Sequence, residues 1–149
     1  MKYSQTWDKK FIDLVNHIAN WSKDKSTKVG AVIVNDRNKI LSVGYNGFPI
    51  GVNDNIDERH ARPTKYKWTA HAEENAILSS AEIGVSLTNC KIYCNYLPCP
   101  RCCRAIIQSG IKEIIYQHET VNSQNTPDPI SKEMLNEARI RVRQYGMDN

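Results

Sequence analysis

Apolar side chains recur at helical spacing along the first part of the chain. Over residues 7–21 the apolar positions fall on one side of a helix, and charged or amide side chains fall on the other. The apolar positions are Trp7, Phe11, Leu14, Val15 and Ile18. The pattern therefore predicts an amphipathic helix, with Thr6 as its N-cap.

Two strands and a long irregular segment are predicted next. Residues 29–34 form a short β-branched run, which is typical of a strand buried on both faces. Residues 36–39 have turn-forming chemistry, and residues 40–45 supply a second strand, so the pair predicts a hairpin. Residues 46–68 show no regular pattern. A loop of this length in a compact domain is usually functional, although most of its charges are expected to face solvent.

Helices and strands alternate after the irregular segment. The pattern predicts a helix that starts near Thr69 or Ala70 and ends at Gly84, followed by a strand over residues 91–95. The side chains of this helix that are expected to face the core are those of Ala76, Ile77, Leu78 and Ala81. A further helix begins at the cysteine pair, with Pro100 in its first turn, and ends at Gly110 before a strand over residues 113–116.

The C-terminal part adds a short helix and a strand. Ser131 is the predicted N-cap of a helix that ends at about Ala138. Residues 140–145 alternate with period two and predict a fifth strand, and a continuation of the preceding helix is the alternative. A hairpin followed by strand–helix alternation predicts an α/β fold with a mixed sheet and helices on both faces. Residues 1–149 are expected to form a single domain.

Composition and charge narrow the possible functions. No apolar run is long enough to cross a bilayer, and the N-terminus lacks the apolar stretch of a secretory signal. Five cysteines, an odd number, argue against a complete disulfide framework and fit a reducing, cytoplasmic location. The net charge of +4 favours an anionic small molecule, but it is too weak to imply a nucleic-acid-binding surface.

One histidine and a pair of cysteines form a candidate zinc site. His71, Cys99 and Cys102 supply three ligands, which leaves the fourth tetrahedral position for water, as in catalytic sites. Glu73 lies two residues after the histidine and is suited to carry a proton beside such a water. A closed structural zinc site is the alternative, because either Cys94 or Cys103 could supply a fourth sulfur.

Several blocks of the chain resemble the deoxycytidylate (dCMP) deaminases. The H-x-E…P-C-x-x-C pattern is the signature of zinc deaminases that act on nucleobases. The more specific block is G-Y-N-G-x-P-x-G, and the blocks that carry the resemblance are residues 29–34, 44–51, 71–77 and 98–102. The resemblance implies a cytidine-deaminase-like three-layer αβα fold with a five-stranded mixed sheet, in which the fourth and fifth strands are parallel.

The resemblance also assigns roles to individual residues. It implies that His71, Cys99 and Cys102 bind Zn²⁺ and that Glu73 is the proton shuttle. The backbone amide of Ala72 would meet the pyrimidine carbonyl, and Asn46 would hydrogen-bond to the sugar–phosphate part of the substrate. The phosphate ligands stay open: Lys28 is the first choice, and the alternatives are Arg59, Arg62, Lys65 and Lys67. Tyr116 is a candidate wall of the substrate site.

The expected activity is hydrolytic deamination of dCMP to dUMP and ammonia, which would supply dUMP for thymidylate synthesis. The alternatives are deamination of another cytosine nucleotide, guanine or tRNA adenosine, and a non-catalytic zinc- or nucleotide-binding module. The resemblance further suggests a homo-oligomer, either a dimer or a hexamer.

Overall fold

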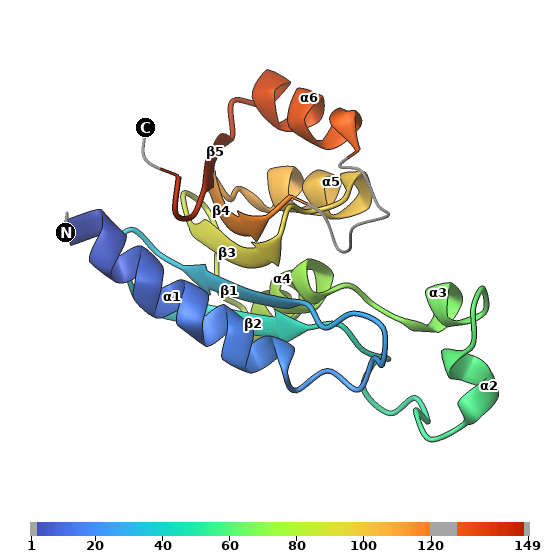
Figure 1. Cartoon of the computed structure of the whole chain (residues 1–149). Helices are drawn as coiled ribbons and strands as arrows, with labels where there is room; N and C mark the ends of the chain where they lie inside the picture. The colour runs from blue at the N-terminus through green and yellow to red at the C-terminus, as the bar shows by residue number, and fades with distance from the viewer. Residues whose placement is uncertain (1–2, 120–127, 148–149) are drawn as a thin grey trace.

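Five β-strands form one mixed sheet in the order β2-β1-β3-β4-β5 (Figure 1). The computed structural model describes residues 3–119 and 128–147. Its strands are β1 (Gly30–Val34), β2 (Ile40–Tyr45), β3 (Lys91–Tyr96), β4 (Glu113–His118) and β5 (Arg141–Gln144). β1 pairs antiparallel with β2 and β3, whereas β3, β4 and β5 are parallel. The predicted hairpin and the parallel fifth strand are therefore confirmed.

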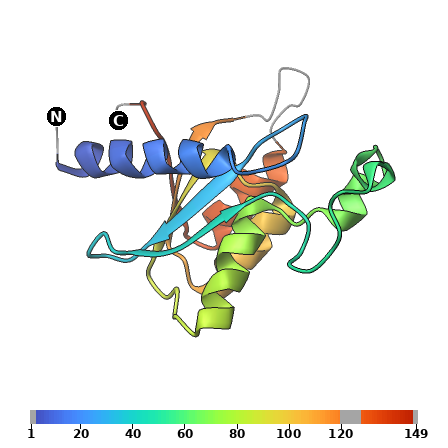
Figure 2. The ribbon, with the colours of Figure 1, turned by 90° about the horizontal axis from the view of Figure 1, so that it is seen from below.

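Helices cover both faces of this sheet. In chain order they are α1 (Tyr3–Ala19), α2 (Asp57–His60), α3 (Lys65–Trp68), α4 (Ala72–Ile83), α5 (Pro100–Ser109) and α6 (Pro129–Glu137). α1 lies on one face, and α4, α5 and α6 lie on the other, which confirms the three-layer αβα arrangement (Figure 2). None of the helices in the described part of the chain has the length and apolar character that a membrane span requires.

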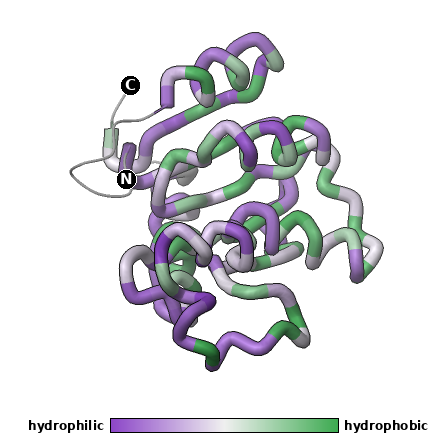
Figure 3. The backbone as a smooth tube through the Cα atoms, turned by 90° about the vertical axis from the view of Figure 1, so that its right-hand side faces the viewer, coloured by the Kyte–Doolittle hydropathy of each residue, from purple (hydrophilic) through white to green (hydrophobic). Residues whose placement is uncertain are grey.

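The core consists of two apolar layers, one on each side of the sheet. Ala31 and Ile33 of β1 face the layer under α4, α5 and α6, whereas Val32 and Val34 face the layer under α1. Every residue of β1 is buried, as expected for a strand covered on both faces. Hydrophobic and hydrophilic residues alternate along the longer helices (Figure 3), as expected for helices that bury one side. The short helix α2 has no buried residue.

Three predicted helix starts are wrong. α1 begins at Tyr3 rather than after Thr6, because no glycine or proline interrupts the chain there. α4 begins at Ala72 rather than at residue 69 or 70, since His71 has an extended backbone conformation. α6 begins at Pro129, and its N-cap is Asp128, whose side chain accepts a hydrogen bond from the Ile130 N–H. Ser131 is a buried residue within that helix.

The predicted inward side of α4 is also partly wrong. Leu78 is 62% exposed and Ala81 is exposed, whereas the buried positions are Ala72, Glu73, Ala76 and Ser80. A close approach of backbones explains this orientation. A Cβ added at Gly44 of β2 would lie 2.3 Å from the Ala72 carbonyl oxygen and 2.5 Å from the Ala76 nitrogen. Only small residues of α4 can face a strand at that distance.

Two short helices and an aromatic stack organise the irregular segment 46–68. The Phe48 ring stacks on His60 at 4.8 Å and on Trp68 at 6.0 Å between ring centroids. The Arg59 guanidinium lies 4.0 Å from the Trp68 ring centroid, and a backbone bridge joins Gly47 to Ala70. These contacts hold α2 and α3 where they project beyond the sheet (Figure 1).

The contact at Gly44 gives a stability prediction. Gly44→Ala is expected to lower the free energy of unfolding by at least about 2 kcal/mol, because the added methyl group meets backbone atoms that cannot move independently of α4. Gly47→Ala is the matched control, since its added Cβ would meet only the Tyr45 ring at 3.9 Å. Urea unfolding of both variants measures the difference. Equal stability of the two would contradict the account of α4 packing.

Candidate metal centre

His71, Cys99 and Cys102 come together at one point, as predicted. The His71 Nδ1 atom lies 3.2 Å from the Cys102 sulfur and 3.4 Å from the Cys99 sulfur. The three candidate ligand atoms all lie within 4.8 Å of one another. Two ligands bound tetrahedrally to one zinc ion, at ordinary Zn–N and Zn–S lengths, lie about 3.5 Å apart. The donor set therefore fits zinc in both chemistry and spacing.

Two helix N-termini bring the ligands to this point. His71 is the N-cap of α4 and Cys99 is the N-cap of α5, with Pro100 in the first turn. The Glu74 carboxylate accepts the His71 backbone N–H at 3.0 Å and also binds the Arg101 guanidinium at 3.0 Å. Glu74 therefore links the two helix starts. The positive ends of both helix dipoles stabilise thiolates there.

The two ligand thiols differ in their protonation. A hydrogen bond from Cys102 lowers the pKa of the Cys99 thiol to about 4, and the same bond, together with burial, raises the pKa of Cys102. A hydrogen bond to Cys99 raises the pKa of His71. Zinc requires deprotonated ligands, so its binding displaces their protons.

Glu73 lies beside the ligand cluster in the first turn of α4. Its side chain is buried, with the residue only 4% exposed, and the Oε1 atom has no hydrogen-bond partner among the described residues. Burial raises the pKa of this carboxyl group to about 7. A buried polar atom without a partner is costly, and a water molecule held at the metal would satisfy it. A carboxyl group with a pKa near neutrality is suited to both accept and donate a proton.

Neither of the other nearby cysteines joins the ligand cluster. Cys94 is buried in the apolar layer under α4, and the Cys103 thiol points to the Pro98 carbonyl oxygen at 3.5 Å. Within the described residues the group able to hold a metal consists of His71, Cys99 and Cys102 alone. Three protein ligands leave a tetrahedral position open, which is the arrangement of catalytic zinc sites.

A pocket with a volume of about 450 Å³ opens onto the cluster. That volume lies within the range of small-molecule sites. Of the residues predicted from the sequence, the pocket is lined by His71, Ala72, Glu73, Cys99 and Asn46, and by two of the alternative phosphate ligands, Arg62 and Lys65. The additional lining residues are Asp24, Thr27, Val29, Tyr66, Thr69, Tyr96, Leu97 and Arg101.

The structure does not bring Lys28 or Tyr116 to this pocket. Lys28 is exposed, and its backbone carbonyl oxygen accepts a hydrogen bond from Asn95. Tyr116 is buried, and its hydroxyl donates to Glu119 at 2.6 Å. The pocket takes its cations from the segment 46–68 and from α5 instead. The sequence suggested Arg62 and Lys65 only as alternative phosphate ligands. It did not suggest Asp24, which belongs to no recognisable motif.

Asn46 lies at the pocket with its amide already engaged by the backbone. Its Oδ1 accepts the Val29 N–H at 2.9 Å, and its Nδ2 donates to the Thr27 carbonyl oxygen at 2.9 Å. An amide has two N–H donors and two acceptor lone pairs, so one of each stays available. The predicted contact of Asn46 with a substrate is therefore compatible with a structural role.

An αβα domain with an open three-ligand zinc site and a buried glutamate beside it has the architecture of a zinc-dependent deaminase. Comparison with known proteins agrees with this class. Residues 5–118 match the family model described as the cytidine and deoxycytidylate deaminase zinc-binding region. The chain belongs to this family.

Relatives from distant organisms match over most of the chain. An uncharacterised deaminase of Aliivibrio fischeri is 39% identical over 145 residues, which is 95% of each chain. The deoxycytidylate deaminase of Homo sapiens is 33% identical over 144 residues, covering 93% of this chain and 79% of the human one. Among solved structures, the dCMP deaminase of cyanophage S-TIM5 in apo form superposes with a TM-score of 0.77 at 27% identity. The match covers 97% of this chain and 99% of the phage chain.

Cysteine substitutions test the ligand assignment. Cys102→Ala is expected to lose zinc, because two ligands hold the ion far more weakly than three. Cys103→Ala is the matched control, since the thiol lies next in the sequence, is equally buried and points away from the cluster. Elemental analysis of the purified variants measures the zinc content. Loss of zinc from the Cys103 variant would mean that this thiol is a fourth ligand and that the site is closed.

Proposed function

We propose that the protein is a dCMP deaminase, which converts dCMP and water to dUMP and ammonia. The observation that carries the proposal is the buried, unpartnered Glu73 carboxyl group beside an open three-ligand zinc site at the base of a pocket. The proposal also has support from the relatives named deoxycytidylate deaminases and from the phage enzyme, which has been solved in complex with dCMP and dUMP.

The proposed chemistry uses Glu73 as the proton carrier. Zinc held by His71, Cys99 and Cys102 would lower the pKa of water from about 15.7 toward about 7. Glu73 would take a proton from the attacking water and deliver it to the ring nitrogen N3 as the C–O bond forms. It would then carry the remaining hydroxyl proton to the amine, so that the C–N bond breaks and ammonia leaves. Because Glu73 ends the cycle in its starting state, one carboxyl group serves as both base and acid.

Backbone and side-chain amides orient the pyrimidine in this proposal. The Ala72 N–H is at the start of α4, where backbone donors have no acceptor within the helix, so it is available to the pyrimidine carbonyl. Asn46 offers its remaining donor and acceptor to the sugar. Val29 and Leu97 line the pocket with apolar side chains, against which the pyrimidine ring would pack.

A spectroscopic assay tests the activity. The zinc-loaded protein is expected to remove the cytosine absorbance band of dCMP, whereas guanine and tRNA adenosine should be unchanged. Glu73→Gln keeps the size and the polarity of the side chain but cannot carry the proton, so it should lower kcat by about 10²–10⁴-fold. Turnover of guanine or tRNA without turnover of dCMP would reject the substrate assignment. An unchanged kcat in the Glu73 variant would reject Glu73 as the proton carrier, and absence of turnover with every one of these substrates would favour a non-catalytic module.

The product dUMP fits a role in supplying thymidylate synthesis, and the five free cysteines fit a reducing compartment such as the cytoplasm. A homo-oligomer, either a dimer or a hexamer, is part of the same proposal.

Ile40 of β2 and Leu78 and Ile83 of α4 are exposed apolar side chains that a second copy of the chain would be able to cover. Light scattering of the purified protein is expected to give a mass at least twice the 17.0 kDa of the chain. A monomeric mass at micromolar concentration would exclude a stable oligomer.

A further inference from the structure

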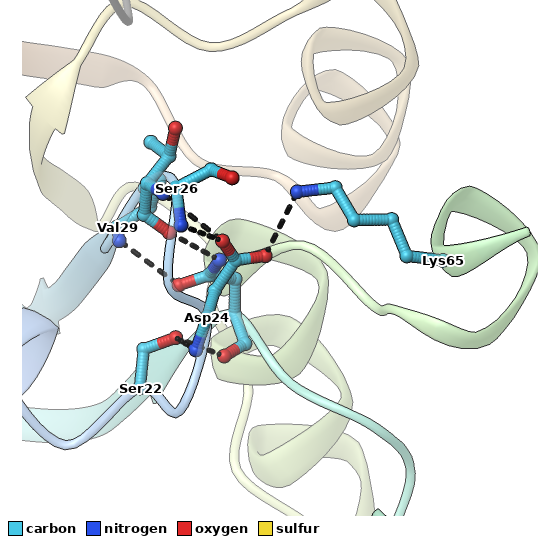
Figure 4. A network of polar contacts seen from close by, with 7 residues as sticks. Ser22, Asp24, Ser26, Val29 and Lys65 are labelled. Carbon is cyan, nitrogen blue, oxygen red and sulfur yellow. Dashed lines mark hydrogen bonds and ion pairs between the residues drawn. The ribbon is translucent and has the colours of Figure 1, made fainter. Parts of the chain in front are cut away.

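A buried lysine lies in the wall of the catalytic pocket. Lys65 belongs to α3, yet the residue is only 8% exposed, whereas its neighbours Tyr66 and Lys67 are exposed. Its ammonium group reaches from the 46–68 segment to the loop before β1, where it meets Asp24 at 3.4 Å (Figure 4). Lysine is rarely buried, and burial of its charge is costly unless a partner compensates it. The position therefore calls for an anionic partner.

Asp24 compensates this charge only in part. Its Oδ1 atom accepts the backbone N–H groups of Ser26 and Thr27 at 2.8 and 3.0 Å, so the carboxylate is fixed by its own loop (Figure 4). Lys65 has three N–H donors, and within the described residues its hydrogen-bond partner is Asp24 alone, at a long distance. Asp24 thus holds the ammonium group at the pocket and leaves donors available for a second anion.

The other basic residues around the pocket differ from Lys65. Arg101 is already bound by Glu74 and its side chain is 55% exposed. Arg62 lines the pocket from the same segment as Lys65, is exposed, and forms no hydrogen bond or ion pair with any residue that the structure describes. Lys65 and Asp24 together are neutral, so Arg62 supplies the net positive charge that a dianion needs.

We infer that Lys65, with Arg62 beside it, binds the 5′-phosphate of the substrate and makes the pocket select a nucleotide over its nucleoside. This inference rests on the proposed function, since it takes the ligand to be a nucleoside monophosphate. A lysine ammonium group is a compact point charge suited to phosphate oxygens. Asp24 is a positioning residue, which keeps Lys65 extended toward the pocket before the phosphate arrives.

Substitution at Lys65 tests the assignment with paired substrates. Lys65→Met keeps the aliphatic stem and removes the charge, and Lys67→Met is the matched control on the exposed side of α3. Lys65→Met is expected to lower kcat/KM for dCMP by about 10- to 100-fold, mainly through KM, because a charge-assisted hydrogen bond is lost. The kcat/KM for deoxycytidine should change less than about twofold. Lys65→Arg should recover part of the loss.

A second variant guards against a folding defect. Lys65→Met leaves Asp24 without its cation, whereas the double change Asp24→Asn and Lys65→Met removes both charges and keeps the Oδ1 acceptor of the loop. Both variants are expected to show the same selective loss for dCMP. Equal losses of kcat/KM for dCMP and deoxycytidine, or a loss no larger than that of Lys67→Met, would overturn the inference without contradicting the proposed function.

Calorimetry with the product separates the two proposals. Binding of dUMP and deoxyuridine to zinc-loaded protein reports the phosphate contact without any turnover. If Lys65→Met weakens the binding of dUMP but not that of deoxyuridine, the contact between Lys65 and the phosphate is supported, whichever reaction the protein catalyses. If the unaltered protein fails to deaminate dCMP, only the proposed function is rejected. If dUMP binds the Lys65 variant as tightly as the unaltered protein, the phosphate assignment is wrong.

Discussion

The contact between α4 and β2 is the constraint on which the site depends. Gly44 lets the backbone of α4 approach the strand so closely that any Cβ there would overlap the Ala72 carbonyl. The position of the first turn of α4 is therefore set by main-chain atoms rather than by side chains that can change rotamer. That turn carries Ala72 and Glu73 and follows the ligand His71. Rigid support of this kind is what a metal site and its proton carrier require.

Two asparagines fix the opposite wall of the pocket. Asn46, after β2, binds the backbone of Thr27 and Val29, and Asn95, in β3, binds the backbone of Lys28 and Gly30. Each amide replaces the hydrogen bonds that a neighbouring strand would supply where β1 begins. The loop that carries Asp24 is thus tied to the sheet from both sides. A pocket residue such as Asn46 can therefore stabilise the fold and contact the ligand at the same time.

Local patterns predicted the strands and the glycine helix ends, because these depend on residues close in sequence. The ligand cluster was predicted from a motif, although its two parts lie 28 residues apart. The β-branched character of residues 29–34 was enough to predict a strand. The spacing of His71, Cys99 and Cys102 was enough to predict a ligand cluster. The inward side of α4 could not be predicted, since Leu78 is excluded by the approach of Gly44 from another strand. Likewise, the burial of Lys65 depends on Asp24, 41 residues earlier in the chain. Lys28 has the same charge, but its side chain has no such partner among the residues that the structure describes.

Charge balance connects the metal to the pocket. Two thiolates beside Glu73 would make the base of the pocket negative and would repel a phosphate. A divalent cation bound by the two thiolates would bring them to neutrality. Asp24 and Lys65 cancel one another, so Arg62 and the helix N-termini then determine the sign of the field that an incoming anion meets. An anionic substrate can therefore share one pocket with two thiolates and the Asp24 carboxylate, because a bound cation and Lys65 balance these groups locally rather than through the net charge of the chain.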